Sequence, residues 1–437
     1  MIESGKRQPV ERGSLAGRLA EEGTPRWFVS PRRPGVSDAH DGSSSRPFPS
    51  IREALRAASP GDVILIRAGT YEEHLVLDKG LARAGTPEAP ILLRGEGMPK
   101  LRASNPEHPL IQVRLPHWRI EGLELDMAGS SACAVSFSHA TQGSCLSRCD
   151  VHGGTGCGLS TREGAAGVLI ENNHIHDFHR EQAGHGCHGV VIHATSQGIT
   201  LRGNHIHDTS GDAVQCLQPD DGRTRPVRGV LIEDNTLEST LGSAVSIKTS
   251  HEIIVRGNRM RNFRCCEGGW RGGDAILVHY SAWNVLIEHN LISEAGGGIC
   301  VGGLKDEGMP DPSRIVVRDN TIRDIHPERA RNNDAVGIRV SNASDVQLLH
   351  NTIGRTRGFA VSLGEGGDGI SRGVEVLGNT MIAARLVRLG LDRPGLQMNL
   401  NRYSTGGLFD AGVLGQTHGL AEWQRFTRLD ADSLLEG

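Results

Sequence analysis

One phrase of apolar and polar positions recurs along most of the chain. It reads apolar-x-apolar-x-x-Asn-x-apolar, as in VLIENNHI, ITLRGNHI and VLIEDNTL. Successive copies of its asparagine are 31, 31, 23, 32, 30, 31 and 28 residues apart. A repeat of this length predicts a solenoid, because such a unit buries its apolar face only by stacking on its neighbours. The repeated asparagines are Asn173, Asn204, Asn235, Asn258, Asn290, Asn320, Asn351 and Asn379.

The stretch around Asn173 shows how one unit is built. Side chains of a strand alternate between its two faces, so we expect Leu169 and Ile175 to point inward and His174 and His176 outward. Asparagine tolerates the left-handed backbone of a sharp bend and bonds to nearby backbone groups. We therefore interpret the repeated asparagines as a structural ladder at the bend between two strands.

A second phrase lies between the asparagines and indicates at least one more strand in each coil. It occurs as GDAVQC at 211–216, GSAVSIK at 242–248 and GDAILVH at 273–279, with related copies at 336–341 and 359–364. Apolar residues with a helical period are absent from this region. The pattern predicts a parallel β-helix. We expect it to be right-handed, because connections between parallel strands of one sheet are almost always right-handed.

The two ends of the chain carry a resemblance to a known family. The segment DGSSSRPFPSIREALRAASPGDVILIRAGTYEEHLVL (41–77) and the closing segment LAEWQRFTRLDADSLLEG (420–437) are similar to those of bacterial pectate-lyase-like β-helix proteins. The closing segment of that group more often has Gly where this chain has Arg428, and often His in place of Ala431. The resemblance covers residues 25–437 and implies a short N-terminal helix that caps the solenoid. It also implies a carbohydrate-active enzyme, since the group includes polysaccharide lyases, uronan epimerases and inverting glycosidases.

The domain organisation follows from the repeats. We expect a tail at 1–24, an N-terminal cap with the first coils at 25–120, β-helix repeats at 121–390 and a C-terminal extension at 391–437. The chain has 437 residues, which a solenoid accommodates in one elongated domain because each coil contacts only its neighbours.

The charge balance excludes some partners. The net charge is −4, so no basic surplus is available for a nucleic-acid backbone, and no run of 18 apolar residues predicts a membrane span. An acidic carbohydrate would therefore need a local basic groove or bound cations. The first residues, MIESGKRQPVERGSLAG, lack the apolar centre of a secretory signal. From the sequence we expect a cytoplasmic protein, although the family is usually exported, unless the true start lies elsewhere.

Nine cysteines are present and none forms a CxxC pair. We expect Cys216 to be an inward-facing core residue, and a reducing compartment fits this usage better than a disulfide framework. Cys265 and Cys266 are adjacent in a predicted loop, where a redox or metal role is one hypothesis.

Alignment of the second phrase by its alternation places outward residues of successive coils in columns. The columns are His193, Leu217, Lys248, His279, Gly302 and Ser341; Val191, Gln215, Ser246, Leu277, Cys300 and Arg339; and His188, Asp212, Ser243 and Asp274. Adjacent coils are about 4.8 Å apart, so Lys248 and His279 are expected to be neighbours. We expect the active face to run over the coils from 188 to 280.

The chemistry that the resemblance implies assigns roles to these residues. Uronan lyases and C5-epimerases remove a carbon-bound proton next to a carboxylate, which needs a tuned base and positive charge on the carboxylate. We predict Lys248 as the base, His279 as its partner or proton donor, and Asp212 and Asp274 as further catalytic residues. The residues expected to bind substrate are His188, His193, Gln215, Trp270, Arg271, Tyr280 and Arg339. Each has a structural alternative: an outward lysine is usually a solvated charge, and an aspartate after glycine often caps a turn.

Calcium is the one cofactor that we consider, and no organic cofactor is expected. Some lyases of the family hold Ca²⁺ with aspartates on an outer strand face, and the corresponding candidates are Asp212, Asp274, Asp220 and Asp221.

Two other functions stay open. Asp212 and Asp274, about 9.6 Å apart by coil spacing, fall at the limit for an inverting glycosidase, and a non-catalytic carbohydrate-binding or structural β-helix is the other alternative.

Histidines cluster in the same part of the chain. Nine of the 20 lie between 152 and 207, and two copies of His-Ile-His-Asp are 31 residues apart. Stacking is expected to place His174 on His205 and His176 on His207. Aligned imidazoles can bind a metal ion or titrate near neutral pH, and the alternative is a solvated ladder without a ligand.

Overall fold

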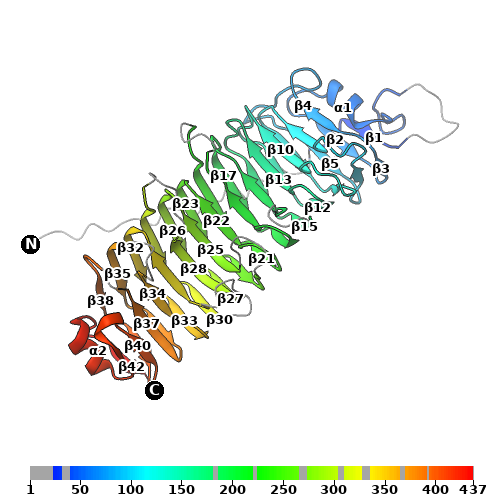
Figure 1. The fold of residues 1–437 in the computed structure, drawn as a ribbon. Helices are drawn as coiled ribbons and strands as arrows, with labels where there is room; N and C mark the ends of the chain where they lie inside the picture. Colours follow the sequence, from blue (N-terminus) through cyan, green and yellow to red (C-terminus); the bar gives the residue numbers. More distant parts are fainter. Residues whose placement is uncertain are drawn as a thin grey trace, which may run out of the picture.

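The protein is a right-handed parallel β-helix, elongated along one axis (Figure 1). The computed structural model describes residues 23–31, 40–180, 186–219, 224–264, 273–303, 310–326, 335–364, 370–390 and 393–436. Within these ranges the strands form three sheets of 14 strands, and successive strands of a coil belong to sheets A, B and C in turn. The predicted fold class is thereby confirmed.

Sheet A contains the residues that precede the repeated asparagine, in each coil that has one. Its strands are β1 (Trp27–Val29), β2 (Val63–Ile66), β5 (Ile91–Gly95), β8 (Trp118–Glu121), β11 (Cys145–Ser147), β14 (Leu169–Glu171), β17 (Gln197–Arg202), β20 (Arg228–Glu233), β23 (His251–Arg256), β26 (Trp283–Glu288), β29 (Ser313–Arg318), β32 (Ser344–Leu349), β35 (Arg372–Leu377) and β38 (Gln397–Asn399).

Sheet B follows directly after the asparagine bend. Its strands are β3 (Thr70–Tyr71), β6 (Lys100–Arg102), β9 (Glu124–Asp126), β12 (Asp150–Gly154), β15 (His174–Phe178), β18 (His205–Thr209), β21 (Thr236–Glu238), β24 (Arg259–Arg261), β27 (Leu291–Ala295), β30 (Thr321–Ile325), β33 (Thr352–Thr356), β36 (Thr380–Ile382), β39 (Arg402–Ser404) and β42 (Leu434–Glu436).

Sheet C contains the second phrase. Its strands are β4 (Leu75–Leu77), β7 (Ile111–Val113), β10 (Val135–Ser138), β13 (Leu159–Arg162), β16 (Val190–Ile192), β19 (Val214–Cys216), β22 (Val245–Lys248), β25 (Asp274–His279), β28 (Gly297–Gly302), β31 (Ile338–Ser341), β34 (Val361–Leu363), β37 (Arg385–Leu389), β40 (Leu408–Asp410) and β41 (Gln416–Thr417). The pair β40–β41 is antiparallel.

Short helices lie at both ends of the solenoid. Helix α1 (Ile51–Ala57) begins after the N-cap Ser50 and buries Ile51, Ala54 and Leu55, as the resemblance implied. Helix α2 (Leu420–Thr427) buries Trp423 and is preceded by a 3-10 turn, η3 (Gly412–Leu414). Its C-cap is Arg428 at φ 58°, a left-handed conformation that glycine adopts without steric cost.

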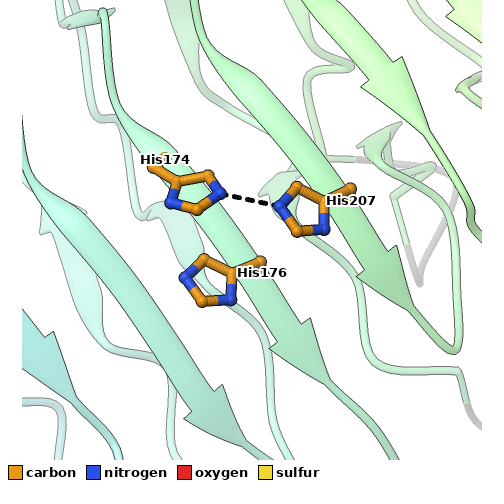
Figure 2. Close-up of side chains that lie close together, drawn as sticks. All are labelled: His174, His176 and His207. Atoms are coloured by element: carbon orange, nitrogen blue, oxygen red, sulfur yellow. Dashed lines mark hydrogen bonds between the residues drawn. The ribbon is translucent and has the colours of Figure 1, made fainter.

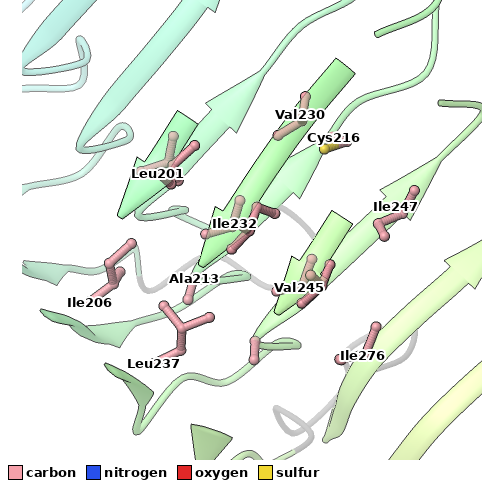
Figure 3. Close-up of a cluster of buried hydrophobic side chains, with 14 of the residues drawn as sticks. Leu201, Ile206, Ala213, Cys216, Val230, Ile232, Leu237, Val245, Ile247 and Ile276 are labelled. Carbon is pink, nitrogen blue, oxygen red and sulfur yellow. The ribbon is translucent and has the colours of Figure 1, made fainter. Parts of the chain in front are cut away.

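The core fills the interior of the coil with aliphatic side chains from all three sheets. Figure 3 shows one section of it, in which Leu201 and Ile232 of sheet A, Ile206 and Leu237 of sheet B, and Val245 of sheet C converge. Cys216 is fully buried in the same cluster, so its predicted core position is confirmed.

The predicted inward position of Leu169 is wrong. Val168 and Ile170 are buried, whereas Leu169 is half-buried on the outer side of β14. The alternation does not continue across the asparagine bend, because Asn172 adopts a left-handed conformation with φ 54° and shifts its phase. Ile175, beyond the bend, points inward as expected.

The stacked asparagines form the predicted ladder. The Oδ1 of each one accepts both the backbone N–H and the Nδ2 of its counterpart in the preceding coil, as Asn204 does from Asn173 at 3.0 Å in each case. Each Nδ2 also donates to a carbonyl of the preceding coil, such as Asn204 to Ile170 at 2.9 Å. The ladder runs from Asn173 to Asn401, where the buried Asp430 accepts the last Nδ2.

We predict that Asn320→Ala destabilises the protein by at least about 2 kcal/mol, because it leaves buried polar groups without a partner at roughly 1–3 kcal/mol each. The backbone N–H of Asn290 would lose its acceptor and the carbonyl of Ile287 would lose the Nδ2 donor, while Asn290 Nδ2 would keep its bonds to Val255 and Glu288. Denaturant unfolding measures the loss. The control is Thr321→Ala, at the next, exposed position, which should change stability by less than about 0.5 kcal/mol. Equal effects of the two substitutions would contradict the assigned role of the ladder.

Candidate functional site

The outward columns predicted on sheet C exist in the structure. Lys248 is directly paired with His279 on neighbouring strands. Gln215 is paired with Ser246, which is paired with Leu277, and the same column continues through Cys300 to Arg339. Arg339 is therefore four strands from Gln215, about 19 Å along the axis. The structure brings Lys248 and His279 together but keeps Arg339 apart from them.

A groove of about 560 Å³ lies over the outward face of sheet C. Its floor comes from β10, β13, β16 and β19, and its lining includes the predicted residues His188, His193 and Gln215. Lys248 and His279 are on the next strands and do not line it. The groove thus overlaps the predicted face only at one end and extends from there toward the N-terminus.

A hydrogen-bond network joins His188, Asp212 and Gln215. The backbone N–H of Asp212 donates to His188 Nδ1 at 2.8 Å, so the neutral imidazole carries its proton on Nε2. Gln215 Nε2 donates to Asp212 Oδ2 at 2.8 Å. Burial lowers the pKa of His188 and the positive charge of Lys248 lowers it further, although the Asp212 carboxylate opposes both. His188 is therefore held as a neutral N–H donor, and Lys248 is on the strand next to the end of the groove.

His279 is more deeply buried than a residue that contacts substrate. Its exposed fraction is 2%, its Nε2 lies 3.5 Å from Ser246 Oγ, and its ring packs against Tyr280 with centroids 4.4 Å apart. Lys248 beside it is half-buried. Of this pair, only the lysine reaches the surface to a substantial extent.

Arg162 is a groove residue that the sequence reasoning missed. It ends β13, where it is paired with Ser138, and the N–H of His193 on the next strand bonds to Thr161. Arg162 therefore occupies the coil before His193 in the column of Lys248 and His279. Among the described residues, no carboxylate forms an ion pair with its exposed guanidinium. Extending the column by one coil toward the N-terminus would have identified it.

Asp212 and Asp274 each lean over a glycine of the following coil. Asp212 Oδ1 accepts the N–H of Ser243 at 2.7 Å and would lie only 2.6 Å from a Cβ at Gly242. Asp274 Oδ1 would lie 1.9 Å from a Cβ at Gly297. These contacts favour the turn-capping alternative, and the catalytic roles of both residues stay predictions.

Calcium binding stays a prediction. Ca²⁺ takes six to eight oxygen ligands; both carboxylate oxygens of Asp212 accept hydrogen bonds, and Asp274 is two coils away. Asp220, Asp221, Trp270 and Arg271 lie outside the described residues, as do Cys265 and Cys266.

A larger trough, of about 780 Å³, lies on sheet A. Apolar Ile254, Leu286 and Val316 form much of its floor, beside Gln347 and Glu375. Trp283 also belongs to sheet A, where its ring stacks on His251 at 4.1 Å, so it is not part of the sheet C face. Because the trough lining contains neither histidine nor lysine, the groove on sheet C is the better catalytic candidate.

Three cysteines line one wall of the groove: Cys133, Cys157 and Cys187. A hydrogen bond with the Cys157 thiol lowers the pKa of Cys133, and Ser160 Oγ, 3.3 Å from its sulfur, acts in the same direction. By contrast, burial raises the pKa of Cys216 to about 12. Cys133 is therefore the more reactive of these two thiols at neutral pH.

The comparisons with known proteins agree with this architecture. A family model described as a Pel9A-like, right handed beta helix region matches residues 27–235, and a second, described as a right handed beta helix region, matches residues 223–387. The chain is thus a right-handed parallel β-helix protein. Over residues 27–235 it is similar to the Pel9A-like members in particular, which confirms the resemblance to pectate-lyase-like proteins. No curated protein matches the sequence significantly.

Solved structures show the same fold at low identity. A PL6 family polysaccharide lyase from Pseudopedobacter saltans is 13% identical, with a TM-score of 0.52 over 94% of this chain and 91% of the lyase. The A-module of a mannuronan C-5 epimerase from Azotobacter vinelandii is 15% identical, with a TM-score of 0.51 over 89% of this chain and 94% of the module. The Dettilon tailspike protein is 12% identical, with a TM-score of 0.51 over 93% of this chain and 68% of the tailspike.

Among the described residues, no helix is long and apolar enough to cross a membrane.

We predict that alkylation of Cys133 by iodoacetamide has a pH midpoint below the ordinary thiol value of about 8.5. Cys157→Ala should move that midpoint upward, because the thiolate loses its hydrogen-bond donor. Peptide mass spectrometry over a pH series measures the midpoint. The alkylation rate at a single pH is less informative, because a thiolate of lower pKa is also a weaker nucleophile. Cys133→Ser identifies the labelled site, and an unchanged midpoint in Cys157→Ala would show that the pair is not coupled.

Proposed function

We propose that the groove on sheet C binds an acidic carbohydrate and that the protein removes the proton next to a uronate carboxylate. The reaction is a β-elimination or a C5-epimerisation. The observation that carries this proposal is the column at the ends of the sheet C strands, which contains Arg162, His193, Lys248 and His279, with Leu217 between His193 and Lys248.

Arg162 binds a carboxylate of the acidic substrate chain three strands from Lys248, about 14 Å along the axis. A guanidinium binds a carboxylate through two parallel N–H donors, and Arg162 is exposed at the groove without a carboxylate partner among the described residues. Binding there holds the acidic chain along the groove, so that another of its uronate units lies near Lys248.

Lys248 is the base in this proposal. A lysine accepts a proton only in its neutral form. Lys248 is half-buried and lies beside His279 on the neighbouring strand. His279, being buried, positions Lys248 and Ser246 and does not contact the sugar.

Neutral donors at the groove bind the sugar oxygens. His188 presents its Nε2 proton while its Nδ1 is held by the backbone of Asp212, and Gln215 is fixed by the Asp212 carboxylate. Asp212 thus acts as the support of two substrate-binding residues. This role uses both of its oxygens, and it agrees with the turn-capping contact to Ser243.

Two outcomes are possible once the C5 proton has moved to Lys248. If the bond to the oxygen at C4 breaks and that oxygen takes up a proton, the product contains a C4–C5 double bond conjugated with the carboxylate. If a proton returns to C5 from the opposite face, the product is the epimer. Both outcomes begin with the same proton transfer, so one incubation in D₂O distinguishes them: deuterium at C5 reports epimerisation and ultraviolet absorbance reports elimination.

We predict that Lys248→Ala lowers kcat by about 100- to 10,000-fold, the range for loss of a general base. Uronate polymers incubated with the enzyme in D₂O should acquire deuterium at C5 if the sugar is epimerised, or absorb ultraviolet light as the unsaturated product if it is cleaved. The matched control is Lys79→Ala, at an exposed position of the N-terminal region, which should retain full activity.

The same assay discriminates the alternatives. New reducing ends without ultraviolet absorbance or deuterium at C5 would indicate hydrolysis. Carbohydrate binding without any chemical change would indicate a binding protein. Either result, or an unaffected Lys248→Ala enzyme, would contradict the proposal.

We predict that Arg162→Ala raises KM for a uronate substrate about tenfold to a hundredfold, since a hydrogen bond to a charged group contributes roughly 1.5–3 kcal/mol. Arg162→Lys should give an intermediate value, because lysine keeps the charge but loses the two-pronged geometry. Steady-state kinetics measure both. The matched control is Arg102→Ala, an exposed arginine on sheet B, which should leave KM unchanged. A KM that does not respond to Arg162→Ala would exclude this residue from carboxylate binding.

A further inference from the structure

The histidine ladder lies on sheet B and is separate from the groove. His174 is paired with His205 and His176 with His207, as the sequence predicted. Figure 2 shows His174 and His176 on β15 and His207 on the neighbouring strand β18, with the three rings turned toward one another. One nitrogen from each of these three side chains lies within 4.8 Å of the others, and this is the only such histidine, cysteine or carboxylate group among the described residues.

Carboxylates hold the Nδ1 side of each ring. Asp150 Oδ1 lies 3.0 Å from His174 Nδ1. The carboxylates that directly follow the other two histidines in sequence do the same for their rings: Asp177 lies 2.8 Å from His176 Nδ1, and Asp208 lies 2.7 Å from His207 Nδ1. A carboxylate on the outer nitrogen of a metal-binding histidine is the usual arrangement that fixes its tautomer and orientation.

These contacts determine where the ring protons are. A carboxylate only accepts hydrogen bonds, so the Nδ1 atoms of His174 and His207 carry the protons and their Nε2 atoms present lone pairs. Yet these two Nε2 atoms face each other at 2.7 Å (Figure 2). Two lone pairs at that distance repel unless a cation or an additional proton is placed between them.

We propose that His174, His176 and His207 bind one divalent transition-metal ion of the zinc class through their Nε2 atoms. Imidazole is a ligand of Zn²⁺ and its neighbours in the first transition row, whereas Ca²⁺ and Mg²⁺ prefer oxygen. Three protein ligands leave the fourth tetrahedral position to water, which is the pattern of a reactive zinc site.

The spacing of the nitrogens suits such an ion. With metal–nitrogen bonds of about 2.0–2.1 Å, tetrahedral ligands are about 3.4 Å apart. This value falls between the 2.7 Å contact of His174 with His207 and the 4.8 Å limit of the group. Asp150 Oδ1 lies 3.0 Å from His176 Nε2, so this nitrogen gives up a proton when it binds the ion, and Asp150 is then within reach of the same ion.

The surroundings attract a cation and leave it accessible. Asp150, Asp177 and Asp208 flank the rings, and Glu238 accepts from the adjacent His205 at 2.8 Å. The exposed fractions of the side chains are 43% for His174, 15% for His176 and 19% for His207. The partial exposure gives a hydrated ion a path to the site.

The test is metal titration of the full chain without a histidine tag, after treatment with a chelator. Zn²⁺ should bind with a stoichiometry of one ion per chain in calorimetry, and Co²⁺ should give the intense visible absorption of tetrahedral coordination. We expect His207→Ala and His174→Ala to weaken the affinity by at least about 100-fold, and Asp208→Asn by about tenfold, as outer partners of metal ligands typically do.

The matched control is His205→Ala. This histidine precedes the ligand His207 by two positions on the same strand and bonds to Glu238, but it does not belong to the converging group. Its removal should change the affinity by less than about threefold. Unchanged far-ultraviolet circular dichroism shows that each variant is folded.

Three results would overturn the proposal: no saturable binding of Zn²⁺ or Co²⁺, equal loss in His205→Ala and His207→Ala, or undiminished binding in His174→Ala. The last would indicate a site elsewhere in the chain. Because the histidines are on sheet B and the groove is on sheet C, the metal titration is independent of the carbohydrate assays.

Discussion

The stacking of one asparagine per coil is the interaction on which the rest of the structure depends. Each side chain is bonded to a carbonyl of the coil before it and to the asparagine of the coil after it, so consecutive coils cannot slip relative to each other without breaking several buried hydrogen bonds. A slip of one residue would turn every inward side chain of a strand outward. The ladder therefore fixes the register of the sheets as well as the sharp bend between sheets A and B. Its closure on Asp430, which also accepts from Tyr403 and Trp423, ties this register to the C-terminal cap.

A fixed register converts distant sequence positions into spatial neighbours. Residues about 30 positions apart meet at about 4.8 Å, so a column of outward side chains is as close as a pair on adjacent strands of any sheet. This explains how Lys248 meets His279, and how His174 meets His205. It also explains why the two sites are independent, since a side chain on sheet B and one on sheet C have the apolar interior of the coil between them.

The repeat allowed the sequence to predict the fold, the ladder and the outward columns, because all three depend only on periodicity. Prediction was wrong where the period is interrupted: Leu169 was placed by counting across a bend whose left-handed Asn172 resets the alternation.

The groove was harder to locate, because its walls come from the turns between strands, whose lengths vary from coil to coil. Arg162 was missed because the column was started one coil too late. The hydrogen bonds of Asp212 could not be foreseen either, since they join its carboxylate to Gln215 and to the backbone of the next coil.

Charged side chains on the outward face of sheet A are paired with opposite charges, whereas some polar groups of the described residues at the candidate sites are not. On sheet A, Arg202, Glu233, Arg256, Glu288 and Arg318 alternate along one column, and each arginine is within ion-pairing distance of a glutamate. Opposite charges on adjacent strands stabilise the stack, whereas like charges directly opposite each other destabilise it.

The column of Arg162, His193, Lys248 and His279 has no carboxylate among these members. The exposed Arg162 in this column forms no ion pair with a carboxylate among the described residues, and an anion bound at the groove supplies that partner. The same reasoning holds in reverse on sheet B, where imidazole lone pairs surrounded by carboxylates are stabilised by a cation. At each candidate site, some polar groups of the stacked strands lack a partner of opposite charge among the described residues. The sign of the missing charge indicates the ligand: an anion at the groove on sheet C and a cation at the histidines on sheet B.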